Sequence, residues 1–164
     1  MMLGVRYGTD QDYDQIMTIY SYAQDYMIQS GNPDQWGHFY PDPELVKSDI
    51  QKGLCKVIFD DECIHGVFAV LEGEDPTYQY IEDGKWLNAE PYVTIHRIAG
   101  DGRVHGLFRC AADYCKSIIS NVRIDTHKNN SIMQRLIEKN GFRKCGTIYV
   151  ADGSPRIAYQ WTAT

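Results

Sequence analysis

The chain has 164 residues, of which 43% are hydrophobic, 23% charged and 12% aromatic, and its formal net charge at pH 7 is -6. This length allows one sizeable core and is too short for two ordinary domains, so we expect a single domain over residues 1–164. The surplus of carboxylates argues against a nucleic-acid partner, because phosphate binding requires an excess of Lys and Arg. It mildly favours a cationic or amine-bearing substrate.

Five cysteines are present, and no two of them are spaced as a CxxC pair. An odd number without such pairs predicts neither a zinc ribbon nor a complete disulfide framework, so we expect reduced, mostly buried thiols. No apolar run reaches the roughly 18 residues of a membrane span, and the N-terminus lacks the layout of a signal peptide. The default expectation is a cytoplasmic protein without a membrane partner.

Capping signals and hydrophobic periodicity predict helices and strands through the first half of the chain. Thr9 followed by Asp10 and Asp12 is typical of a helix N-terminus, and Gly31-Asn32-Pro33 supplies a stop. Two apolar, β-branched runs separated by three acidic residues predict a hairpin. In chain order we expect a strand at residues 4–7, a helix from Thr9 to Met27, a short helix at 43–52, and hairpin strands at 55–59 and 64–71.

Residues 72–91 are polar and are interrupted by Gly73, Pro76 and Gly84. Such a composition predicts an insertion on the sheet rather than a regular element. Apolar and aromatic residues on both sides of Asp83-Gly84 indicate a small extra hairpin within it.

The second half of the chain predicts an alternation of strands and helices. Asn130 is a helix N-cap and Asn140-Gly141 a C-terminal signal. We expect strands at 92–99, 121–125, 143–150 and 156–161, and helices at 103–118 and 131–139. A strand–helix–strand order in the middle requires a parallel crossover, so the fold class is α/β (α+β) with a mixed sheet.

The turn Arg103-Val104-His105-Gly106-Leu107-Phe108 opens a helix directly after the strand at 92–99. The first N–H groups of a helix have no intrahelical acceptor, and the helix dipole adds positive partial charge there. A pyrophosphate binds favourably at such a position. The turn is the feature of the sequence that points most directly to chemistry.

This turn, the order of the elements and residues 130–142 together resemble the GCN5-related N-acetyltransferase (GNAT) family, over nearly the whole chain. The acetyl-coenzyme A turn of the family has Gln or Arg, two residues, Gly, one residue, then Gly or Ala. Here Arg103 and Gly106 match, whereas Phe108 replaces the small residue. The stretch KNNSIMQRLIEKNGF matches the Asn and the Glu-Lys-x-Gly-Phe ending of the family, with Ile137 where many members place a proton-donating Tyr.

The resemblance implies a mixed, mostly antiparallel central sheet whose fourth and fifth strands splay apart, flanked by about four helices. It implies acetyl-coenzyme A as cosubstrate and direct attack by a primary amine of a small molecule or peptide, with no metal required. Backbone groups near Ile98 and Ala99 would pair with the pantetheine arm. The remaining cofactor-binding residues that it implies are Arg103, Val104, His105, Gly106, Leu107, Phe108, Asn130 and Met133.

Three side chains are candidates for proton transfer. His96, on the strand at 92–99, is the first candidate for the base, and the alternative is an imidazole packed on the sheet face. His127 is the second candidate, against an ordinary solvated loop position. Because Ile137 cannot donate a proton, Tyr149 is a candidate acid, although a strand tyrosine most often packs.

Aromatic residues supply the candidates for an acceptor-binding wall. They are Trp36 and Tyr40 between the first two helices and Tyr92 on the strand at 92–99. Aromatic clusters under loops are also common as small satellite cores, so both interpretations stay open.

Two other functions remain open. Phe108 and Ile137 also fit a non-catalytic acetyl-coenzyme A-binding or regulatory protein, and the glycine turn fits a plain interaction domain. The sequence names neither the acceptor amine nor the oligomeric state, which leaves a monomer and a homodimer as alternatives.

Overall fold

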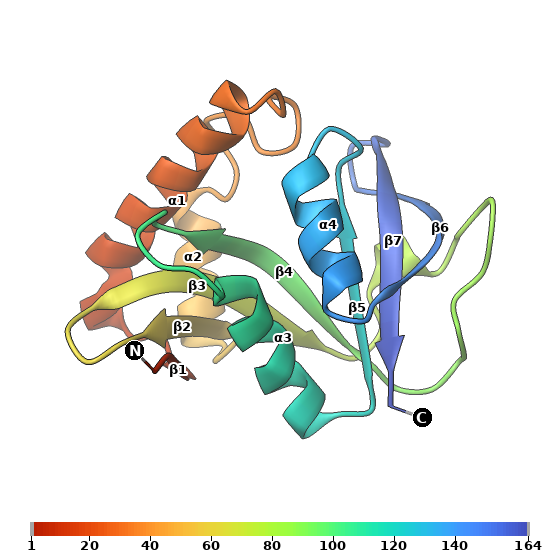
Figure 1. The fold of residues 1–164 in the computed structure, drawn as a ribbon. Helices are drawn as coiled ribbons and strands as arrows, with labels where there is room; N and C mark the ends of the chain where they lie inside the picture. The colour runs from red at the N-terminus through yellow and green to blue at the C-terminus, as the bar shows by residue number, and fades with distance from the viewer. Residues whose placement is uncertain (1, 164) are drawn as a thin grey trace.

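In the computed structural model, which describes residues 2–163, a twisted sheet lies between helices on both of its faces (Figure 1). The elements in chain order are β1 (Gly4–Tyr7), a 3₁₀ helix η1 (Asp10–Asp12), α1 (Tyr13–Gln29), α2 (Pro43–Gln51), β2 (Cys55–Phe59), β3 (Ile64–Glu72), a 3₁₀ helix η2 (Pro76–Tyr78), β4 (Val93–Gly100), α3 (Leu107–Ile118), β5 (Asn121–Thr126), α4 (Ser131–Lys139), β6 (Arg143–Tyr149) and β7 (Pro155–Thr162).

The seven strands lie in the order β1-β2-β3-β4-β5-β7-β6. Every neighbouring pair is antiparallel except β4 and β5, which run parallel and are connected through α3. The expected fold class, a mostly antiparallel mixed sheet with one parallel crossover and four α-helices, is therefore confirmed.

Local capping explains where the helices begin. The side chain of Asn130 accepts a hydrogen bond from the N–H of Met133 at 3.1 Å, and α4 occupies the residues that its capping signals predicted. Thr9 caps the short turn η1, so α1 begins later than predicted, at Tyr13. In that turn Asp12 accepts hydrogen bonds from the backbone N–H of Thr9 and from Arg6.

Two hydrophobic cores lie on opposite faces of the sheet, beneath the helices that cover each face in Figure 1. One packs α1 and α2 against β2 and β3, around fully buried residues such as Ile16 and Val57. The other packs α3 and α4 against the strands and contains Phe108, Ile137 and Phe142. The alternation of buried side chains along β2 sends Val57 to the first core and Ile58 to the second, as a two-residue strand period requires.

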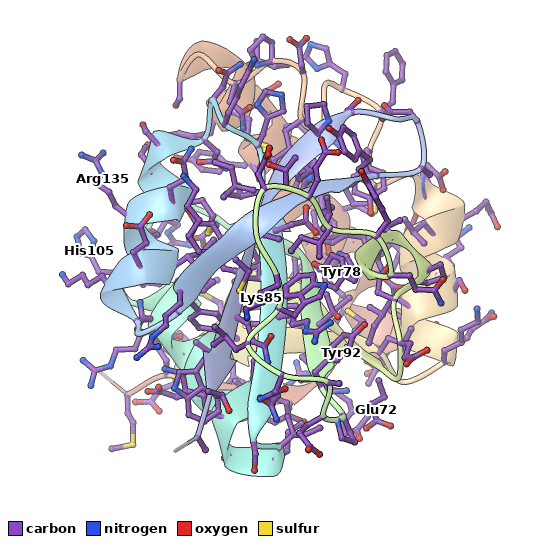
Figure 2. The ribbon with its side chains drawn as sticks, turned by 90° about the vertical axis from the view of Figure 1, so that its right-hand side faces the viewer. Glu72, Tyr78, Lys85, Tyr92, His105 and Arg135 are labelled. Atoms are coloured by element: carbon purple, nitrogen blue, oxygen red, sulfur yellow. The ribbon has the colours of Figure 1, made fainter. Side chains whose placement is uncertain are left out.

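The extra hairpin predicted within residues 72–91 is wrong. Besides η2, this segment contributes a single bridge, in which the backbones of Glu82 and Thr147 exchange hydrogen bonds of 3.0 and 2.9 Å. The side chains of Tyr78 and Tyr92, labelled in Figure 2, form a third small core, and Trp86 packs against it. Burying these aromatic rings outweighs pairing the segment with itself, so its backbone docks on β6 instead.

The five cysteines are free thiols, and three of them, Cys55, Cys115 and Cys145, are buried. The expectation of reduced, mostly buried thiols is therefore confirmed. Between residues 2 and 163, none of the helices is long and apolar enough to cross a membrane.

Candidate active site

β4 and β5 pair only where they begin, at Val93 with Val122 and Thr94 with Arg123. Further along β4 the register with β3 slips by one residue, because Ala69 faces His96 while Val67 faces Ala99. Arg97 lies in this bulge with a φ of 53°, and its carbonyl accepts a hydrogen bond of 2.8 Å from the hydroxyl of Tyr20. A bulge turns a strand away from its neighbour, so the splay that the resemblance implied is present.

A cleft of about 730 Å³ lies where the two strands separate. Its walls come from the loop between α1 and α2, from both splayed strands, from the start of α4 and from the loop between β6 and β7. The predicted residues that line it are Trp36, Tyr40, His96, Ile98, Asn130 and Met133.

His96 forms a close pair with Asp75 in this cleft, with 2.7 Å between Nε2 and Oδ2. The same carboxylate accepts hydrogen bonds from the N–H and the hydroxyl of Thr77. Although burial raises the pKa of Asp75, the hydrogen bonds from His96 and Thr77 outweigh it and lower that pKa to about 2. Asp75 is therefore a carboxylate at neutral pH. When Nε2 donates its proton to Asp75, Nδ1 is the ring atom with a free lone pair.

Asp125 and Arg156 also line the cleft. The hydroxyl of Tyr78 donates to Asp125 at 2.7 Å, and burial raises the pKa of this aspartate. Arg156 is buried and donates to the carbonyl of Pro155. The sequence did not single out Asp75, Asp125 or Arg156. Asp75 lies in the irregular segment 72–91, where no periodic pattern indicates which side chains face His96.

The candidate coenzyme turn provides free donors at the start of α3. The first intrahelical bond runs from the N–H of Cys110 to the carbonyl of Gly106 at 3.0 Å, which leaves the N–H groups of Leu107, Phe108 and Arg109 without intrahelical acceptors. Gly106 has a φ of 84°, and a Cβ placed there would contact no atom within 4 Å. The N–H of Arg103 donates to Asp101 and is therefore occupied within the loop.

The two departures from the family pattern, Phe108 and Ile137, both lie in the core. Phe108 is 4% exposed and packs on Phe142, with 6.1 Å between the ring centroids. Its ring is therefore buried in the core, and only its N–H remains available at the turn. Ile137 is fully buried in the same core.

Asn130 connects two walls of the cleft. While its Oδ1 caps α4, its Nδ2 donates to Gln35 of the loop between α1 and α2 at 3.3 Å. Trp36 and Tyr40 of that loop pack edge to face, with 6.0 Å between their ring centroids.

The other three side chains predicted for proton transfer or acceptor binding, His127, Tyr149 and Tyr92, lie outside the residues that line the cleft. His127 is buried, and its Nδ1 accepts from the N–H of Asn129; burial, with a smaller contribution from Arg156, lowers its pKa. The hydroxyl of Tyr149 donates to Glu82, in the segment between β3 and β4. The hydroxyl of Tyr92 accepts a hydrogen bond of 2.8 Å from the N–H of Asp75.

Solved structures resemble this fold closely. A GNAT-family acetyltransferase from Streptococcus agalactiae 2603 is 30% identical, with a TM-score of 0.90 over 99% of this chain and 96% of that one. A GNAT-family acetyltransferase from Listeria monocytogenes 4b F2365 shares the fold at 16% identity and a TM-score of 0.73, with 98% and 95% covered. The structure of the NatC complex bound to Gag peptide and CoA shares the fold at 12% sequence identity and a TM-score of 0.63, with 100% of both chains covered.

No protein-family model and no curated protein sequence matches the chain. The relationship therefore rests on the fold, on the extent of the alignment and on the 30% identity to the streptococcal enzyme. The splayed β4 and β5 and the free N–H groups at the start of α3 agree with it. The chain belongs to the GNAT family.

Proposed function

We propose that the protein is an N-acetyltransferase that moves an acetyl group from acetyl-coenzyme A to a primary amine of a small molecule or peptide. The observation that carries the proposal is the His96–Asp75 pair, which lies in the cleft between the splayed strands of a GNAT fold. Acetyl transfer in general is supported by the similarity to GNAT acetyltransferases.

Coenzyme A would occupy the side of the cleft formed by Ile98, Asn130 and Met133. A neighbour in the same fold, the NatC complex, is bound to CoA. The free N–H groups from Leu107 to Arg109 are suited to the pyrophosphate, and the unpaired edge of β4 near Ile98 and Ala99 to the pantetheine amide groups. Nothing in this arrangement requires Phe108 to be small, because its ring is in the core.

The acceptor amine would reach the thioester from the side of His96 and Trp36. The carboxylates of Asp34 and Asp152 also line the cleft and favour a cationic ammonium group over an anionic acceptor. Nδ1 of His96 removes one proton from the bound ammonium group, and the neutral amine nitrogen then attacks the thioester carbon, while Asp75 holds the ring by Nε2. The nitrogen loses its second proton to water as the tetrahedral adduct collapses and the thiolate leaves. A backbone N–H of the bulge near Ile98 stabilises the developing oxyanion.

The thiolate leaves without a tyrosine acid in this proposal. The family position of that tyrosine is occupied by Ile137 in the core, and Tyr149 is bonded to Glu82 outside the cleft. A thiolate is an acceptable leaving group, because a thiol pKa is only about 8.5. We therefore expect water, or the imidazolium of His96, to return the proton.

Binding and turnover test the proposal separately. Acetyl-coenzyme A at about 100 times its Kd should stabilise the folded protein by about 2.7 kcal/mol, and an amine panel should release free thiol. His96→Ala should lower kcat about a hundredfold or more with the coenzyme-induced thermal shift intact. His38→Ala, at an exposed histidine that does not line the cleft, is the matched control.

The outcomes separate the alternatives. An unchanged kcat in His96→Ala would remove His96 as the base. Binding of acetyl-coenzyme A without thiol release from any amine would favour the non-catalytic, regulatory protein. The absence of any thermal shift with acetyl-coenzyme A would exclude both the acetyltransferase and the regulatory coenzyme-binding protein, and would leave an interaction domain.

A further inference from the structure

The turn between β2 and β3 brings Asp60, Cys63 and His65 together, and none of the three lines the cleft. Oδ2 of Asp60 lies 2.8 Å from Nε2 of His65, and Sγ of Cys63 lies 3.3 Å from the same nitrogen. One oxygen, one sulfur and one nitrogen donor atom therefore lie within 4.8 Å of one another.

The carboxylate of Asp60 is oriented by the turn itself. Its Oδ1 accepts hydrogen bonds from the N–H groups of Glu62 and Cys63, at 2.8 and 2.9 Å. The N–H of Asp60 donates to the carbonyl of Cys63 at 3.0 Å and closes the turn. Oδ2 thus faces the imidazole of His65, and a cation would replace the hydrogen bond between Oδ2 and Nε2.

The imidazole of His65 is held from its other nitrogen. Nδ1 lies 2.8 Å from Oδ2 of Asp101, and only 4% of the side chain is exposed. A histidine that ligates a metal through one ring nitrogen usually donates the other N–H to a carboxylate, which fixes the tautomer and increases the basicity of the ligating nitrogen. Asp101 stands in this relation to His65.

We propose that Asp60, Cys63 and His65 form a binding site for a zinc-like divalent cation, with Asp101 as the carboxylate that orients His65. A mixed thiolate, imidazole and carboxylate set suits Zn²⁺ or Co²⁺ and does not suit Mg²⁺ or Ca²⁺, which prefer oxygen ligands. Three protein ligands leave the fourth tetrahedral position for water.

The cation takes the place of a proton. A proton on Nε2 of His65 would be directed at Oδ2 of Asp60, and Cys63 is a free cysteine. Binding forms one bond each to Sγ, Nε2 and a carboxylate oxygen, and it releases the proton of the thiol and the proton of the imidazolium. Two protons per cation are therefore released when both groups start protonated.

This site is connected to the candidate coenzyme turn through Asp101. Oδ1 of Asp101 accepts from the N–H of Arg103 at 2.9 Å, and the N–H of Asp101 donates to the carbonyl of His65 at 2.9 Å. A cation at His65 therefore stabilises the first residues of the loop that leads into α3. Its role is structural support of that loop, and the chemistry in the cleft does not depend on it.

Titration of the metal-depleted full-length protein with Co²⁺ tests the site. We expect the visible absorption of tetrahedral Co²⁺ with a thiolate-to-cobalt charge-transfer band, and loss of both signals when Zn²⁺ is added. Cys63→Ser should abolish the charge-transfer band, and Cys110→Ser, at another partly exposed cysteine, should retain it. Asp101→Asn should weaken Co²⁺ binding about 10- to 100-fold.

The absence of both signals, or an unchanged charge-transfer band in Cys63→Ser, would overturn the proposal. An unchanged Co²⁺ affinity in Asp101→Asn would remove Asp101 from it. A second measurement needs no variant: Zn²⁺ should slow alkylation of Cys63 in the wild-type chain, while alkylation of Cys110 proceeds at its metal-free rate. Equal alkylation of Cys63 with and without Zn²⁺ would contradict the site even if Cys63→Ser failed to fold.

Discussion

The guanidinium of Arg97 donates two hydrogen bonds to the carboxylate of Asp49, from Nε to Oδ2 and from Nη2 to Oδ1, each of 2.9 Å. Arg97 belongs to the bulge of β4 and Asp49 to α2, and both side chains are buried, with 8% and 5% exposed. The hydroxyl of Tyr40 accepts a further hydrogen bond from Nη1 of Arg97 at 3.1 Å. The positive φ at Arg97 is thus held by contacts to two other segments of the chain.

Removing the charge of Asp49 should destabilise the fold strongly. Asp49→Asn leaves a buried guanidinium without its countercharge, for which we expect a loss of about 3 kcal/mol in the free energy of unfolding. Urea denaturation measures it. Asp113→Asn, in the exposed pair of Arg109 and Asp113, is the control and should change stability by less than about 0.5 kcal/mol. Equal losses in the two variants would contradict the account of the bulge.

Phe108 should matter for stability rather than for coenzyme access. Because its ring packs on Phe142 in the core, Phe108→Ala should cost about 3–5 kcal/mol. Phe39 is 85% exposed, so Phe39→Ala should be nearly neutral by thermal or urea unfolding. If Phe108→Ala left stability unchanged and tightened the binding of acetyl-coenzyme A, the ring would have been obstructing the turn after all.

Asp75 should act on turnover through His96. Asp75→Asn removes the carboxylate that accepts from Nε2, so we expect kcat to fall about ten- to a hundredfold, with little change in the thermal shift that acetyl-coenzyme A causes. Thiol release measures turnover. Asp14→Asn, on the exposed side of α1, is the control. A normal kcat in Asp75→Asn would show that the pair does not take part in the reaction.

The pair of Arg6 and Asp12 should make stability depend on acid pH. The hydrogen bond from Arg6 lowers the pKa of Asp12 to about 2, against the opposing effect of burial. Because an unfolded aspartate has a pKa of about 3.9, the stabilisation is complete above about pH 5 and is lost as pH falls towards 2.

At pH 7 we expect Asp12→Asn to be less stable than the wild type by about 1–2 kcal/mol. The difference should shrink in urea titrations repeated at pH 5, 4 and 3. A gap that stayed constant over this range would mean that the charge of Asp12 is not what stabilises the turn. Asp10→Asn, at an exposed neighbouring position, should show no such gap at any pH.

The sequence predicted those elements whose ends carry local signals. α4 occupies its predicted residues because Asn130 caps it and Asn140-Gly141 ends it. The splay of the sheet was expected from a family resemblance, and the bulge at Arg97 agrees with it. Short-range hydrogen bonds decide where such elements begin and end, so local sequence patterns predict them.

Contacts between distant segments were not predictable in this way. Asp75 and His96 are 21 residues apart, and Arg97 and Asp49 are 48 apart, so no periodic pattern connects them. The wrong prediction of a hairpin in residues 72–91 has the same cause, because Tyr78 and Trp86 pack in a core on the sheet in place of pairing as strands across a local turn. Likewise, Asp101 reaches His65 across 36 residues.

The insertion of β7 between β5 and β6 has a consequence for biosynthesis. β1 to β4 lie in the sheet in the order in which they are translated, whereas β5 gains its antiparallel neighbour only from residues 155–162. β7 leaves the ribosome after the other six strands, so one edge of β5 has no partner strand until then. Premature termination within the loop before β7 would therefore leave an exposed strand edge, which favours aggregation, beside an otherwise finished half of the sheet.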